Sequence, residues 1–213
     1  MSSELDTDRL AVLIHEVRSP VAALSAIAET VSDGGLDTVT RQELVRLVML
    51  ACRGIERIVG DVAVASVRLE EVDPSALVRD VAVAARLRGW RVEAEIPQRA
   101  VPRIQADPSR LRQVLDNLLA NAVVHGGKDG VVRLRLGVDD SVVVEVIDAG
   151  PGIPAAELER IFDVGVRLEA DRPGTGLGLA VSRAIVEAHG GALTATSAPG
   201  RGTTMIIALP LTG

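Results

Sequence analysis

The sequence predicts an α+β protein, in which a helical hairpin is followed by a mixed sheet with helices on one face. Two runs with apolar residues at the three-four spacing of helices fill roughly the first third of the chain. In the remainder, alternating segments typical of strands outnumber the helical ones. The chain has 213 residues, of which 47% are apolar, so it can bury a sizeable core.

The hairpin is predicted from two apolar stripes separated by the turn-rich stretch "SDGGLDT". The stripes consist of Leu10, Leu13, Val17, Pro20 or Val21, Leu24, Ile27 and Val31, and then of Leu44, Leu47, Ala51, Ile55, Ile58, Val62, Ala65 and Leu69. Two helices with one stripe each cannot bury both stripes alone. We therefore expect a homodimer that forms a four-helix bundle, and packing of the hairpin onto the rest of its own chain is the alternative.

The stretch "IHEVRSPVAAL" contains a histidine that lies off the first stripe and is expected to face solvent. Pro20 follows His15 within the same helical pattern. A proline inside a helix costs about 3 kcal/mol, because it lacks an N–H and crowds the carbonyl four residues back, which here belongs to Glu16. The first helix is therefore expected to bend just beyond His15.

A domain boundary is predicted in "EEVDPSALVRDV", which divides the chain into residues 1–71 and 72–213. Pro74 suits the first turn of a new helix. Strands are expected at "RVEAEIP", "VVRLRLG", "SVVVEVI", "ALTATSA" and "TTMIIALPL", and a capped helix at "DPSRLRQVLDNLLANAVVHGG". The turns "VDD" and "PGRG" imply hairpins, and therefore an antiparallel or mixed sheet.

Composition excludes several classes of protein. A net charge of −6 and only two aromatic residues, Trp90 and Phe162, argue against a nucleic-acid partner. Lys128 is the one lysine, so a phosphate site must use arginine or backbone amides. A single cysteine, Cys52, excludes intrachain disulfides and fits a reducing compartment. No apolar stretch of about 18 residues is free of charge, so we expect a cytoplasmic chain without a membrane segment. The alternative is that this chain is a fragment of a membrane-bound protein.

Polar side chains recur every four residues on the helix that begins near Asp107. Gln113, Asn117, Asn121 and His125 therefore share one face. A solvated face usually carries Lys and Glu, so amides that end in a histidine favour a binding site over a solvent-facing stripe.

Two glycine-rich stretches follow this helix. In "VIDAGPGIP" a strand ends at Asp148, whose carboxylate can accept a hydrogen bond from an exocyclic amine, while Gly150 and Gly152 let a flat ring approach the backbone; an ordinary turn is the alternative. In "GTGLGLAVSRAIVEAHGG" three glycines, Gly174, Gly176 and Gly178, open a helix whose N-terminal amides suit an anion. His189, which precedes two glycines at the end of that helix, is interpreted as structural.

Taken in order, these stretches resemble the sensor histidine kinases of two-component signalling, over most of the chain. "HEVRSP" is similar to the phosphoacceptor box of that family, "RLRQVLDNLLANAVVH" to its asparagine box, "DAGPGIP" and "GTGLGLA" to its two glycine boxes, and "GTTMIIALP" to its closing strand. The resemblance implies a dimerisation and histidine phosphotransfer hairpin over residues 1–71. It implies an α/β-sandwich ATP-binding domain of the gyrase and histidine-kinase type over residues 72–213.

The resemblance also implies ATP and Mg²⁺ as cofactors. By this carry-over Asn121 ligates Mg²⁺, Asp148 reads the adenine amine and Thr203 supports the Asp148 end of the pocket. The expected nucleotide-binding set is Asn117, Asn121, His125, Asp148, Gly150, Gly152, Gly174, Gly176, Gly178 and Thr203.

The expected catalytic set is His15, Glu16 and Ser19. The resemblance makes His15 the phosphorylated residue and an aspartate of a response regulator the acceptor. Glu16 can take or orient the proton on the other imidazole nitrogen. Ser19 stands where phosphatase-competent members carry Thr or Asn, and its hydroxyl can still orient a water, so a weak phosphatase activity is a further expectation.

The chain departs from the family at two places. Val124 stands where a lysine or arginine is common, so one positive charge near the phosphates is missing. Gly165 stands where a second aromatic commonly packs. Arg167 or Arg172 is left to reach the γ-phosphate instead. One alternative function is therefore a phosphotransfer or scaffold protein whose degenerate ATP domain binds no nucleotide. Another is a dimeric ATPase without phosphotransfer, which "HEVRSP" disfavours. Both glycine boxes and Asn121 favour the autokinase.

Overall fold

The computed structural model describes residues 67–126, 130–163, 166 and 176–211, together with six isolated helical positions, 22, 27, 40, 44, 47 and 48. The chain divides into two compact units, Met1–Val62 and Ala63–Gly213. The predicted hairpin and its dimeric bundle lie outside the described residues, apart from those six positions. Among the described residues, no helix has the length and apolar character needed to cross a membrane.

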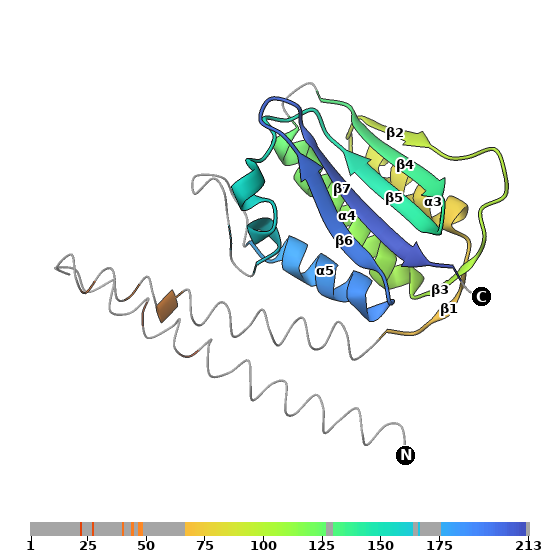
Figure 1. The fold of residues 1–213 in the computed structure, drawn as a ribbon, viewed down its shortest axis with the longest axis horizontal. Helices are drawn as coiled ribbons and strands as arrows, with labels where there is room; N and C mark the ends of the chain where they lie inside the picture. Colours follow the sequence, from red (N-terminus) through yellow and green to blue (C-terminus); the bar gives the residue numbers. More distant parts are fainter. Residues whose placement is uncertain are drawn as a thin grey trace, which may run out of the picture. The chain divides into compact units, whose positions relative to one another are not determined.

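The second unit is a mixed sheet with helices packed on one face, which confirms the predicted α+β class (Figure 1). The helices are α3 (Pro74–Leu87), α4 (Pro108–His125) and α5 (Gly178–Ala188), with short 3-10 turns η1 (Ala155–Glu157) and η2 (Arg160–Phe162). The strands are β1 (Glu70–Val72), β2 (Val92–Glu95), β3 (Ile104–Ala106), β4 (Val132–Val138), β5 (Ser141–Ile147), β6 (Ala192–Ser197) and β7 (Thr203–Pro210).

Five strands form the main sheet in the order β2-β4-β5-β7-β6. β2 runs parallel to β4 and the other neighbours are antiparallel. The strands β1 and β3, which the sequence did not predict, form a separate antiparallel pair. The boundary predicted between residues 71 and 72 falls within β1, and the domain assignment itself stays a prediction.

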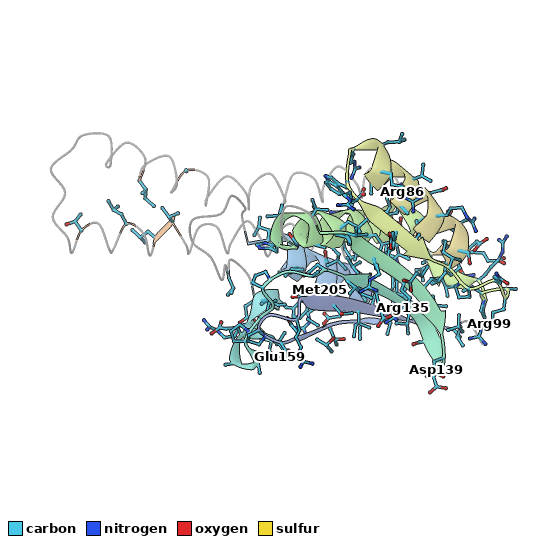
Figure 2. The ribbon with its side chains drawn as sticks, turned by 90° about the horizontal axis from the view of Figure 1, so that it is seen from above. Arg86, Arg99, Arg135, Asp139, Glu159 and Met205 are labelled. Atoms are coloured by element: carbon cyan, nitrogen blue, oxygen red, sulfur yellow. The ribbon has the colours of Figure 1, made fainter. Side chains whose placement is uncertain are left out.

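The core lies between the sheet and the helices. Along β5 and β7 every second side chain is buried, as in Val142, Val144 and Val146, because alternate residues of a strand point to opposite faces. The outer face carries charged residues such as Arg135 (Figure 2). Arg135 pairs with Glu145 on the neighbouring strand.

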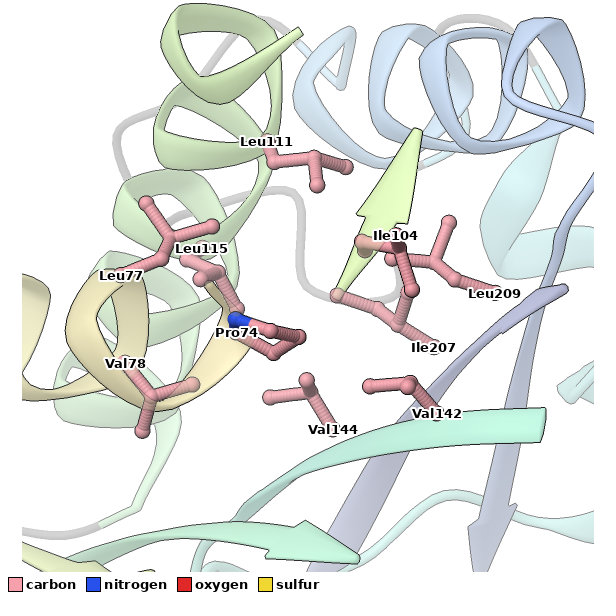
Figure 3. A pocket seen from close by; sticks show the side chains of 10 residues that line it. All are labelled: Pro74, Leu77, Val78, Ile104, Leu111, Leu115, Val142, Val144, Ile207 and Leu209. Carbon is pink, nitrogen blue, oxygen red and sulfur yellow. The ribbon is translucent and has the colours of Figure 1, made fainter. Parts of the chain in front are cut away.

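A small apolar pocket lies at one end of this core (Figure 3). Its lining is Pro74, Leu77, Val78, Ile104, Leu111, Leu115, Val142, Val144, Ile207 and Leu209. The cavity has a volume of about 10 Å³, which is no more than one water occupies. It is therefore a packing void and not a ligand site.

Asp107 joins three segments at the start of α4. Its Oδ1 accepts hydrogen bonds from the Ser109 hydroxyl at 2.6 Å and from the Ser109 and Arg110 N–H groups at 3.0 and 3.1 Å. Its Oδ2 accepts the Arg68 N–H at 3.0 Å. The Asp107 N–H in turn donates to Nε2 of buried His189 at 2.9 Å, and Nδ1 of His189 lies 2.7 Å from the Ile185 carbonyl. His189 is therefore a neutral imidazole that joins α5 to α4, in keeping with the structural role inferred from its sequence.

These contacts set the acidity of Asp107. Burial raises the pKa of this carboxyl, but the hydrogen bonds from Ser109, Arg68 and Arg110 together lower it from an ordinary 3.8 to about 2. Because the pKa is depressed in the folded state, the ionised carboxylate stabilises the fold above about pH 4. That contribution is lost as the pH falls toward about 2.

We predict that Asp107→Asn lowers the free energy of unfolding by about 1–2 kcal/mol at pH 7, because a neutral amide accepts weaker hydrogen bonds than a carboxylate. Urea unfolding of both proteins should be measured at pH 7, 4 and 2.5. The difference in free energy of unfolding between the wild type and Asp107→Asn should become smaller as Asp107 becomes protonated. Asp73→Asn, at the N-cap of α3, is the matched control and should cost less, since that carboxylate accepts two N–H bonds. A difference that does not change with pH would contradict the assignment.

Candidate functional site

The helix α4 supplies the polar face that the sequence predicts. Asn117 and Asn121 are half-buried on this helix, and His125 is exposed at its last residue. The opposite side of α4 is buried in the core through Leu111, Val114, Leu115, Leu118, Leu119 and Ala122. Burial of that side fixes the direction in which the amides face.

Asn117 ties α4 to the beginning of α5. Its Nδ2 donates a hydrogen bond to the Ser182 hydroxyl at 3.0 Å, and Ser182 is 2% exposed. A Cβ added to Gly178 would lie 2.2 Å from Oδ1 of Asn117, so a side chain there would have to displace the Asn117 amide. The glycine-rich start of α5 therefore lies directly against the amide face of α4.

Asp148 stands immediately after β5, and the two oxygens of its carboxylate differ in their hydrogen bonds. Oδ1 accepts the N–H groups of Gly150 at 2.8 Å and Thr203 at 3.2 Å. The Asp148 N–H donates to the Thr203 carbonyl at 2.9 Å. Oδ2 accepts no hydrogen bond from the residues that the structure describes. A half-buried carboxylate is thus held by one oxygen and presents the other as an acceptor.

Two glycines after Asp148 allow the backbone to come close to neighbouring segments. A Cβ on Gly150 would lie 2.4 Å from the carbonyl oxygen of His125, which brings the turn after β5 against the end of α4. Gly152 has φ of +74°, and its Cβ would lie 2.0 Å from the Ala198 carbonyl. Side chains at either position would push these segments apart.

The structure thus brings together most of the residues that the sequence led us to expect at a nucleotide site. Three of its residues lie on α4, three lie at or after the end of β5, Gly178 begins α5, and Thr203 begins β7. Gly176, with φ of +74°, lies just before α5. Gly174 and the catalytic set His15, Glu16 and Ser19 lie outside the described residues. Sequence reasoning missed Ser182, which is bonded to Asn117, and Ser197, which is bonded to Ile153; both partners are distant in the chain.

The implied cofactors can be tested against these residues. The exocyclic amine of a nucleobase can donate to Oδ2 of Asp148, which accepts no hydrogen bond from the described residues. Within residues 67–126, 130–163 and 176–211, no three His, Cys, Asp or Glu side chains gather in a metal site. Mg²⁺ commonly takes one or two protein oxygens plus phosphate oxygens and waters, so the Asn121 side chain fits such an ion only together with a phosphate.

The profile of the family described as histidine kinase-, DNA gyrase B-, and HSP90-like ATPase matches residues 106–213. Over 216 residues the chain is 37% identical to the probable sensor histidine kinase TcrY of Mycobacterium tuberculosis, covering 93% of this chain and 44% of that protein. Over 221 residues it is 31% identical to the adaptive-response sensory kinase SasA of a Synechococcus species, covering 95% and 58%. The chain thus spans about half the length of these relatives.

Solved structures of histidine kinases are also similar to this chain. Full-length ShkA in complex with AMPPNP matches with a TM-score of 0.64 and 27% identity, covering 95% of this chain and 45% of that one. The mycobacterial sensor histidine kinase MprB matches with a TM-score of 0.57 and 32% identity, covering 67% and 97%. The family match, these similarities and the site geometry together show that the chain belongs to the histidine kinase-, DNA gyrase B-, and HSP90-like ATPase family, as a catalytic core of the two-component sensor histidine kinase type.

Proposed function

We propose that this chain is an ATP-dependent histidine autokinase, which phosphorylates His15 and passes the phosphoryl group to an aspartate of a response regulator. The observation that carries the proposal is the carboxylate of Asp148, which the backbone holds through Oδ1 while Oδ2 is left as an acceptor. An acceptor in that place suits the exocyclic amine of adenine. The sensor kinases similar to this chain, and the AMPPNP complex of ShkA, support ATP as the nucleotide.

In the proposed reaction a neutral imidazole nitrogen of His15 attacks the γ-phosphorus of ATP, and the bond from that phosphorus to the bridging oxygen of ADP breaks. A histidine with an ordinary pKa of about 6.5 is largely neutral at pH 7, and therefore nucleophilic. Glu16 takes or orients the proton on the other nitrogen. The regulator aspartate then attacks the phosphorus, and His15 returns to its neutral form.

Mg²⁺ would neutralise charge on the phosphate oxygens when bound. We assign Asn121 as its protein ligand, and Asn117 and His125 as residues that line the phosphates. The α5 N-terminus, with the glycines Gly174, Gly176 and Gly178, supplies backbone amides that suit an anion.

In this proposal residues 1–71 are the dimerisation and phosphotransfer hairpin, and residues 72–213 are the ATP-binding domain. The partners are a second copy of the chain and a response regulator; a nucleic acid is not expected at a net charge of −6. The need for ATP and a reducing environment for Cys52 favours the cytoplasm. Ser19 supports at most a weak phosphatase activity.

The competing proposal is a phosphotransfer or scaffold protein that binds no nucleotide. The uncharged Val124, exposed at the end of α4, is the observation in its favour, since it adds no charge near the phosphates. The alternative predicts no ATP binding and no autophosphorylation. The geometry of Asp148 favours the autokinase.

We predict that Asp148→Asn weakens ATP binding about 10- to 100-fold, because Asn keeps an oxygen for the Gly150 and Thr203 N–H groups but places an amide donor where Oδ2 stood. Calorimetry with a non-hydrolysable ATP analogue measures the effect. The control is Asp139→Asn, at the β4–β5 turn and thus at the opposite end of β5 from Asp148 (Figure 2). Equal affinity in the wild type and Asp148→Asn would remove Asp148 from the site.

Replacing His15 by Gln should abolish the acid-labile, base-stable phosphate that forms with Mg-ATP. Because His15 is expected to lie off the apolar stripe, the free energy of unfolding should change by no more than about 0.5 kcal/mol. Glu16→Gln should slow the reaction roughly 10²-fold while ATP affinity stays unchanged. Phosphate on His125, His189 or a serine would defeat the assignment.

The proposed dimer is tested by Leu24→Glu, which places a carboxylate in the apolar stripe of the hairpin. Burying that charge unpaired costs several kcal/mol, so the variant should be monomeric or aggregated. Light scattering at tens of micromolar measures the mass of both proteins. A monomeric wild type at that concentration would contradict the four-helix bundle.

A further inference from the structure

Ser197 is a site residue that the sequence motifs do not single out. It is the last residue of β6 and pairs with Thr203, the first residue of β7. Its Oγ lies 2.8 Å from the Ile153 nitrogen, 2.6 Å from the Gly202 carbonyl oxygen and 3.0 Å from the Thr203 hydroxyl. One hydroxyl thus joins the turn after Asp148 to the start of β7.

The direction of these three hydrogen bonds follows from the chemistry of the partners. A carbonyl oxygen only accepts, and a backbone N–H only donates. Ser197 has one proton, and it goes to the Gly202 carbonyl. Ser197 must therefore accept from both Ile153 and Thr203, so the Thr203 proton points at Ser197. The Thr203 oxygen keeps its lone pairs for another donor.

Thr203 is also bound to Asp148. Its N–H donates to Oδ1 of Asp148, and its carbonyl accepts the Asp148 N–H. Its side chain is buried on the same sheet face as Met205 and Ile207, the face that the helices cover. Oδ2 of Asp148 and Oγ1 of Thr203 therefore belong to two residues that are hydrogen-bonded to each other, and both oxygens can accept a further hydrogen bond.

We infer that Ser197 is a positioning residue, which fixes the Thr203 hydroxyl as an acceptor and so favours purines with a 6-amino group over purines with a 6-oxo group. The inference rests on the proposed function and adds a determinant of nucleobase choice to it. A 6-amino group offers two N–H donors to two acceptors, whereas a 6-oxo group faces them with its own lone pairs. A site built to pair with one of these groups leaves its acceptors unpaired with the other.

The test compares the affinity of the full chain for Mg-ATP and Mg-ITP, whose bases carry a 6-amino and a 6-oxo group. Ser197→Ala frees the Thr203 hydroxyl to turn and donate to the 6-oxo group. The ATP-to-ITP preference should therefore fall about 3- to 10-fold, the range of one neutral hydrogen bond. Thr194→Ala, an exposed residue on the same strand, is the control and should keep the preference of the wild type.

Thr203→Val provides a second variant that keeps the shape of the side chain but has no hydroxyl. It should also reduce the preference, and adding Ser197→Ala to it should change the preference no further, because Ser197 acts through that hydroxyl. Equal weakening of ATP and ITP in Ser197→Ala would make Ser197 merely structural and overturn the inference. A wild type that binds neither nucleotide would instead defeat the proposed function.

Discussion

The carboxylate of Asp148 is the constraint on which the site depends, because Oδ1 is held by the backbone while Oδ2 accepts no hydrogen bond from the described residues. Oδ1 accepts two backbone N–H groups, from the turn that follows it and from the first residue of β7. These bonds hold the side chain at a strand end, where the chain must also turn. Only with Oδ1 occupied in this way does Oδ2 keep a fixed direction. The base recognition proposed for Oδ2 is therefore a consequence of how the turn is closed.

The beginning of α5 is positioned by contacts on both of its sides. Asn117 of α4 donates to buried Ser182, and Gly178 packs against the same amide. On another face of α5, the guanidinium of Arg183 lies 4.3 Å from the centroid of the Phe162 ring, and it pairs with Glu159 at 3.3 Å. A cation over an aromatic face is attracted by the ring quadrupole. The segment from Glu159 to Phe162 and the helix α5 are thus joined by contacts outside the glycine motif.

Local patterns in the sequence predicted much of this domain. The Pro-led helices, the β4–β5 and β6–β7 hairpins, and the turn at Asp148 all follow from residues that are close together in the chain. The β1–β3 pair, the parallel contact of β2 with β4, and the partners of Ser182 and His189 were not predicted. Asn117 and Ser182 are separated by 65 residues, and Asp107 and His189 by 82. A serine or histidine has the same local pattern whether or not a distant donor meets it.

The two ends of α4 are fixed by different means, and the polar face between them depends on both. At its first turn the helix is capped by Asp107, which also holds the Arg68 N–H and, through its own N–H, the ring of His189. At its last turn the carbonyl of His125 lies against Gly150. Asn117 and Asn121 lie between these points on a helix whose other side is buried. Because the helix packs against the turn after Asp148 at one end and is hydrogen-bonded to His189 beyond α5 at the other, the fold itself constrains the distance between the amide face and the Asp148 carboxylate.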